Sequence, residues 1–112
     1  MSDIQELIEL LVQFRDDRDW GQFHDSKNLA LALSIEAAEL NELFLWKKDS
    51  ESKNIDRERL KEELADVFAY ALMLAERNNL SVSDIVKQKI QKNAEKYPVE
   101  ECRGSSAKYK ET

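Results

Sequence analysis

Apolar residues recur at helical spacing along most of the chain, in segments that polar or turn-forming residues separate. The first segment begins after Ser2, which has the sequence context of a helix N-cap, and ends near Arg18. The second begins after Asp25 or Ser26 and extends to about Lys47. We therefore predict a helix over each of these two segments.

Two further helices are predicted in the second half of the chain. Asp56 can cap a third helix, whose apolar stripe continues to Ala75. Ser81 begins a fourth helix that runs to Tyr97, where Pro98 stops it. With only two Gly and one Pro, the chain has few residues suited to the turns of an all-β fold. The prediction is an all-α protein whose protomer resembles a four-helix bundle.

Acidic residues interrupt the apolar character of two predicted helices. Glu36 and Glu39 lie three residues apart in the apolar run of the second helix, and Glu63 and Asp66 repeat this spacing in the third. Residues three apart on a helix project from the same side. A buried carboxylate is rare unless it is paired or binds a metal, so the two acidic pairs indicate one shared cation site.

Four carboxylates provide only oxygen ligands, which suit Mg²⁺ or Mn²⁺ better than Zn²⁺. A di-iron site is disfavoured because such sites use Glu-x-x-His pairs, whereas the single histidine, His24, has Gly21 three residues before it. The alternative is an exposed acidic face that pairs with Lys at i+4. Leu40 and Leu43 occupy those positions after Glu36 and Glu39, which weakens this alternative.

The loop between the first two helices contains Trp20, Phe23 and His24. Trp20 and Phe23 can close the end of the bundle, contact a ligand, or do both. The third helix is apolar on several sides, and one small protomer can hardly cover it. We therefore expect a homodimer or homotetramer.

Composition limits the partners and the location. The net charge of −6 disfavours general binding to nucleic acid or to an anionic membrane. The single cysteine, Cys102, and the lack of a signal peptide or transmembrane pattern favour a reducing, cytoplasmic setting. Residues 1–98 are expected to form one helical domain, and the polar residues 99–112 a C-terminal tail.

The sequences Glu36-Ala-Ala-Glu39 and Glu63-Leu-Ala-Asp66 resemble the signature of the MazG-like superfamily of all-α nucleoside triphosphate pyrophosphohydrolases. The similarity to its dCTP-pyrophosphatase-like branch extends to other stretches of the chain: residues 18–24, 27–29 and 44–47, then Lys89, Asn93, 96–98, 103–105 and 108–109. This resemblance also implies an oligomer, and it suggests that the tail could order against the active site or a neighbouring subunit.

The resemblance implies hydrolysis of a (d)NTP to (d)NMP and pyrophosphate, with dCTP-like or non-canonical nucleotides as substrates. The metal ligands would be Glu36, Glu39, Glu63 and Asp66, and of these we favour Glu39, with Glu36 second, as the catalytic base. Phosphate contacts would come from Lys27, Lys89, Asn93 and Lys96, and base or sugar contacts from Trp20, Phe23, His24, Trp46 and Tyr70. The alternative is a non-catalytic helical interaction or regulatory module that retains an acidic metal site.

Overall fold

The computed structural model describes residues 2–48 and 55–104, and its regular elements in this part of the chain are all helical. The prediction of an all-α fold is confirmed. The chain divides into two compact units, residues 1–79 and 80–112. Within the described residues, no helix combines the length and the apolar character needed to cross a membrane.

The first unit contains three α-helices and one 3₁₀ turn: α1 (Asp3–Asp17), η1 (Gly21–Phe23), α2 (Ser26–Glu42) and α3 (Arg57–Arg77). Each α-helix begins at a capping side chain that the sequence predicts. Ser2 accepts from the Gln5 amide at 3.2 Å, Asp25 accepts from the Asn28 amide, and Asp56 caps α3. These caps satisfy backbone donors that have no partner inside the helix.

Helix α2 ends at Glu42, so the prediction that it continues to about Lys47 is wrong. The next residues form successive tight turns, in which the amides of Leu43, Phe44 and Leu45 each donate to the carbonyl three residues earlier. Leu43, the first residue after the helix, is buried within these turns. Trp46 ends them with φ of 64°, a left-handed conformation that bulky residues seldom adopt.

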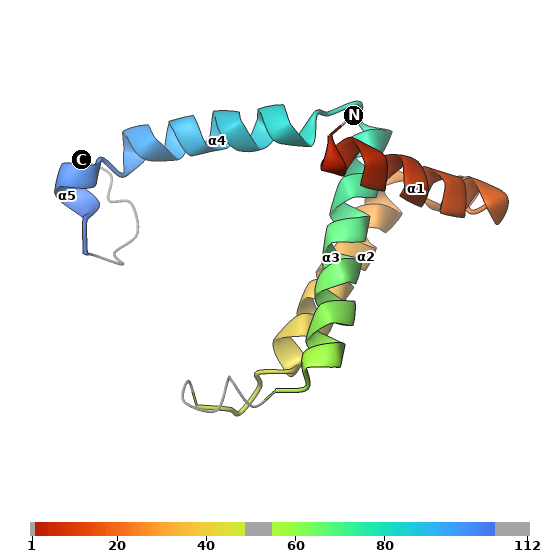
Figure 1. Cartoon of the computed structure of the whole chain (residues 1–112), viewed down its shortest axis with the longest axis horizontal. Helices are drawn as coiled ribbons and strands as arrows, with labels where there is room; N and C mark the ends of the chain where they lie inside the picture. Colours follow the sequence, from red (N-terminus) through yellow and green to blue (C-terminus); the bar gives the residue numbers. More distant parts are fainter. Residues whose placement is uncertain (1, 49–54, 105–112) are drawn as a thin grey trace. The chain divides into compact units, whose positions relative to one another are not determined.

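Helices α2 and α3 lie antiparallel and side by side (Figure 1), and α3 packs mainly against α2. The side-chain amide of Asn78, just after α3, donates to the Ser26 hydroxyl at the start of α2 at 3.1 Å. The buried apolar residues belong to this pair of helices and the turns that follow α2: Leu29, Leu43, Leu72, Met73 and Ala75. The α2–α3 pair therefore forms the core of the first unit.

Helix α1 packs against α3 and leaves an apolar groove of about 570 Å³ between them. Leu10 on α1 is 64% exposed and Phe68 on α3 is 60% exposed, although both line this groove. Large apolar side chains therefore remain accessible within the first unit.

The second unit contains α4 (Val82–Lys96) and the short helix α5 (Val99–Cys102). Ser81 caps α4 by accepting from the Asp84 amide at 3.4 Å, and the helix ends before Pro98, as predicted. Helix α5 lies in the stretch predicted as a polar tail. The rest of that tail, residues 105–112, lies outside the described residues.

Candidate active site

Three carboxylates meet where α2 and α3 pack together. Glu36 and Glu39 come from one side of α2, and Glu63 comes from α3. One carboxylate oxygen from each lies within 4.8 Å of the others, and all three residues are partly buried. The two helices thus bring together three of the four carboxylates that the sequence predicts as a cation site.

Two oxygens in this cluster lack partners. Glu36 Oε2 and Glu63 Oε2 are buried and have no hydrogen-bond partner among residues 2–48 and 55–104. Burial first, and then the carboxylates of Glu39, Asp66 and Glu63 nearby, raise the pKa of Glu36 from 4.5 to about 7. Burial and Glu39 also raise the pKa of Glu63, against a lowering effect of Arg59. The site therefore holds unfavourable negative charge, which a cation would relieve.

Asp66 extends the cluster along α3. It follows Glu63 by one helical turn, it is exposed, and its negative charge contributes to the raised pKa of Glu36. Asp66 also lines a second cavity, of about 260 Å³. It is therefore the residue that connects the carboxylate cluster with this cavity.

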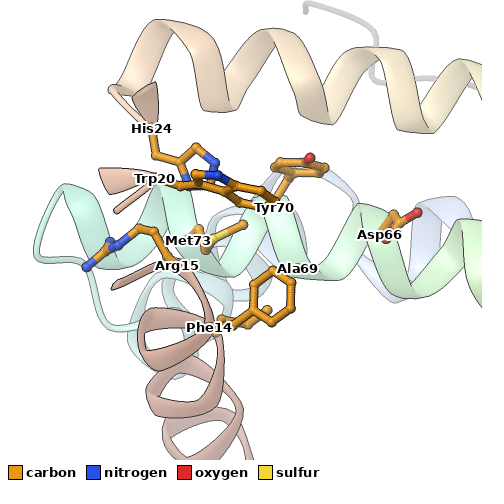
Figure 2. A pocket seen from close by; sticks show the side chains of 9 residues that line it. Phe14, Arg15, Trp20, His24, Asp66, Ala69, Tyr70 and Met73 are labelled. Carbon is orange, nitrogen blue, oxygen red and sulfur yellow. The ribbon is translucent and has the colours of Figure 1, made fainter. Parts of the chain in front are cut away.

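The second cavity combines aromatic and apolar side chains from α1, the α1–α2 loop and α3. Figure 2 shows the rings of Trp20, His24 and Tyr70 gathered along it, with Asp66 further along α3. The Trp20 and His24 ring centroids are 6.3 Å apart, and the Phe14 ring meets Trp20 edge-on at 5.8 Å. We call this the aromatic pocket; its lining residues are Leu11, Phe14, Arg15, Trp20, His24, Asp66, Ala69, Tyr70 and Met73.

Tyr70 lies between the two parts of the site. It follows Asp66 by one helical turn, and its pKa is raised above 10.0 by burial and then by the negative charges of Glu36, Asp66 and Glu39. The phenol therefore keeps its proton at neutral pH. It can donate a hydrogen bond to an anionic ligand that enters the aromatic pocket.

A family model described as the MazG-like family matches residues 31–112. This match covers both acidic pairs and more than half of the chain. The chain belongs to the MazG-like family.

Curated relatives of this MazG-like chain are enzymes named dCTP pyrophosphatase 1. Those of Rattus norvegicus and Homo sapiens are both 40% identical to it, over 95% and 96% of the chain. The chain spans only 65% and 66% of the length of these two proteins. A solved pyrophosphatase from Archaeoglobus fulgidus superposes with a TM-score of 0.83 at 38% identity, over 88% of this chain and 94% of that one. The resemblance inferred from the sequence is confirmed.

Some predicted base or sugar contacts of the MazG-like site lie outside the aromatic pocket. Trp20, His24 and Tyr70 line it, but Phe23 and Trp46 do not, and Trp46 is 94% exposed. The suggestion that Phe23 closes the end of the bundle finds little support, because this side chain is 60% exposed.

The predicted phosphate-binding residues are divided between the two units. Lys27 is exposed in the first turn of α2. Lys89, Asn93 and Lys96 are exposed on α4, at spacings of four and three that place them along one side of that helix. Their phosphate contacts stay a prediction.

The contribution of α1 to the site was not predictable from the sequence pattern. Leu11, Phe14 and Arg15 line the aromatic pocket, together with Met73 of α3. The apolar members follow the spacing of an ordinary core stripe, and Arg15 resembles a solvated charge near a helix end. No local signal distinguishes such residues from structural ones.

Proposed function

We propose that this chain hydrolyses a nucleoside triphosphate between its α and β phosphates, releasing a nucleoside monophosphate and pyrophosphate. Deoxycytidine nucleotides are the favoured substrate class, a proposal supported by the names of the curated relatives. The observation that carries the proposal is the juxtaposition of a carboxylate cluster and an aromatic pocket, which Asp66 connects. The carboxylate cluster suits a cation that would bind the triphosphate, and the aromatic pocket suits a nucleobase.

Mg²⁺ or Mn²⁺ is the proposed cofactor, with Glu36, Glu39, Glu63 and Asp66 as its ligands. The unpartnered carboxylate oxygens and the raised pKa of Glu36 support this assignment. When bound, such a cation offsets phosphate charge and makes water a better nucleophile.

Glu39 is the proposed base that orients the attacking water, and Glu36 is the second candidate. Glu39 is the common neighbour in the cluster, because it contributes to the raised pKa of both Glu36 and Glu63. A carboxylate beside the residues that would hold the cation can accept a proton from the attacking water.

Trp20, His24 and Tyr70 are proposed to contact the base and sugar, because they line one pocket. Aromatic faces stack on nucleobases, and the Tyr70 hydroxyl can donate to a sugar or phosphate oxygen. Lys27, Lys89 and Lys96 are proposed to offset phosphate charge, and Asn93 to donate a hydrogen bond to a phosphate oxygen. Phe23 and Trp46 are proposed to add apolar contact with the nucleoside.

Product analysis tests this function directly. The full-length chain is incubated with a panel of NTPs and dNTPs, with Mg²⁺, with Mn²⁺ and with EDTA, and the products are separated by anion-exchange chromatography. The expected products are the monophosphate and pyrophosphate, formed only with metal and fastest from deoxycytidine nucleotides. A diphosphate and inorganic phosphate would contradict the bond assignment. The absence of products under all conditions would favour the non-catalytic module.

Replacing Trp46 by Gly is expected to raise KM roughly 10-fold or more, since stacking on a base is worth about 1–3 kcal/mol. The melting temperature should stay the same or rise, because Gly relieves the left-handed strain at φ of 64° and the lost side chain is 94% exposed. Steady-state kinetics and thermal melts measure the two effects. Trp46→Phe is the control, which keeps an aromatic face and should raise KM less. A lower melting temperature with unchanged KM would instead assign Trp46 a packing role.

We also propose that the protein is a homodimer or homotetramer. Support comes from the apolar groove between α1 and α3, where Leu10 and Phe68 remain largely exposed within the first unit. Burying such side chains against a second copy is favourable by about 25 cal/mol per Å² of apolar area. The groove therefore provides a surface on which two copies can associate.

Sedimentation at micromolar concentration should give the mass of two or four chains. Phe68→Glu should shift this mass toward one chain, because a carboxylate in an apolar interface loses its hydration. Phe68→Leu keeps the apolar character and should leave the mass unchanged. A wild-type mass of one chain would contradict the oligomer.

A further inference from the structure

The aromatic pocket has walls from two different parts of the first unit. Trp20 and His24 belong to the loop between α1 and α2, whereas Tyr70 and Met73 belong to α3. The width of the pocket therefore depends on how firmly this loop is held against α3.

Arg15 lies in the last turn of α1, just before the loop that holds Trp20. Its side chain makes a contact that links this part of the chain to α3. Its Nη1 atom lies 3.2 Å from Glu76 Oε2 on α3, a residue 61 positions away in the chain. Glu76 follows Met73 by three residues, so it continues the side of α3 that lines the pocket. The Arg15 side chain is only 15% exposed, which limits the screening of this ion pair by solvent.

The backbone and side chain of Arg15 also hold the loop. The Arg15 carbonyl accepts hydrogen bonds from the amides of Trp20 at 3.0 Å and Arg18 at 3.2 Å. Gly21 lies beside the Arg15 side chain: a Cβ added at Gly21 would be in ordinary van der Waals contact with Nε, at 3.6 Å. A shift of Arg15 would therefore move Trp20 and the start of η1 with it.

We propose that the Arg15–Glu76 ion pair is a positioning contact that sets the separation of Trp20 from Tyr70 and thereby the affinity for nucleotide. Arg15 also lines the aromatic pocket, whereas Glu76 does not, and neither residue belongs to the acidic cluster or to the proposed phosphate contacts. Glu76 acts through Arg15 and Trp20. The part of this proposal that concerns nucleotide rests on the proposed function. The part that concerns the position of Trp20 does not.

Glu76→Gln tests the positioning role, and Asp16→Asn is its matched control. Each change removes one carboxylate partner of Arg15, but Asp16 is the neighbour of Arg15 on α1 and makes no link to α3. Glu76→Gln is expected to raise KM for the nucleotide roughly 10-fold with a smaller change in kcat, while Asp16→Asn leaves both nearly unchanged. Displacing a bound substrate by 1 Å can lower the reaction rate about 100-fold, so the 10-fold change in KM corresponds to a shift of Trp20 by less than this distance. Arg15→Lys keeps the charge and should raise KM less than Glu76→Gln.

A second measurement follows Trp20 without relying on catalysis. In a Trp46→Phe background, Trp20 is the only tryptophan, and acrylamide quenching reports its accessibility. Glu76→Gln should increase quenching at temperatures well below the melting transition, and Asp16→Asn should not. The double exchange Arg15→Glu with Glu76→Arg restores opposite charges and should return quenching toward the starting value.

The outcomes separate this inference from the proposed function. If Glu76→Gln only lowers the melting temperature, with KM and quenching unchanged, the ion pair is structural and the inference is wrong. If the wild type hydrolyses no nucleotide, the proposed function fails, while quenching still decides whether the pair positions Trp20.

Discussion

Replacing Glu36 by Gln is expected to reduce the rate of pyrophosphate release by at least about 100-fold. Mutating a residue that only orients a metal ligand already lowers metal affinity or activity by about 10–100-fold. Glu36→Gln should also raise the melting temperature of the metal-free protein. Glu36 has a pKa of about 7 because it is removed from water and surrounded by other carboxylates. Gln cannot ionise, and its amide can donate to the neighbouring carboxylate oxygens. A loss of function would thus accompany a gain of stability.

Asp66→Asn is the matched control for this prediction. It also removes one negative charge from the proposed ligand set, so activity should again be almost lost. Asp66 is exposed, and its ionised form is better hydrated than that of Glu36, so the melting temperature in EDTA should change less. Thermal melts and product assays of both variants measure these effects. If Glu36→Gln melts lower in EDTA and retains activity, the cluster is a structural hydrogen-bonding network.

The stability of the metal-free protein should fall as pH rises from about 4.5 to about 7. Glu36 ionises near its ordinary value of 4.5 in the unfolded chain but near 7 in the folded protein. The folded state therefore binds more protons between these values, and the free energy of unfolding decreases with increasing pH there. The raised pKa of Glu63 acts in the same direction.

Mg²⁺ should oppose this loss, because a cation binds the ionised carboxylates and competes with protons. Binding to the folded state alone adds about 2.7 kcal/mol when free metal exceeds its dissociation constant 100-fold. Thermal melts at pH 5 and pH 7.5, in EDTA and in Mg²⁺, measure both effects. Subtracting the pH dependence of the melting temperature of Glu36→Gln from that of the wild type leaves the contribution of the Glu36 carboxyl group. A wild-type profile in EDTA that matches the variant would contradict the raised pKa.

Interactions between residues close together in the chain were predictable from the sequence, whereas packing between helices was predictable only in part. The caps Ser2, Asp25, Asp56 and Ser81 were identified because each bonds within three residues of itself. The end of α2 was not identified. Residues 43–46 contain no Gly or Pro, and the helix ends in turns that bury Leu43, which is a tertiary effect.

In the candidate site, too, groups close together in the chain were predictable and pairs distant in the chain were not. Glu36, Glu39 and Glu63 could be grouped in advance, because carboxylates three apart in apolar helices are unusual enough to indicate a shared role. Arg15 and Glu76 could not be paired, because they lie 61 residues apart and each is an ordinary charge near a helix end. Periodicity reports which side of a helix is buried, but it does not report which helix covers that side.

The placement of the carboxylates across the antiparallel α2–α3 pair also has a kinetic consequence. The chain cannot complete this main interhelical contact without bringing Glu36, Glu39 and Glu63 within a few ångströms of one another. Their repulsion opposes docking, so it raises the barrier to folding when all three are ionised. A cation that binds only after the helices have docked does little for the folding rate and acts mainly by slowing unfolding. The lifetime of the folded protein, more than the speed of its formation, would then depend on the concentration of available metal.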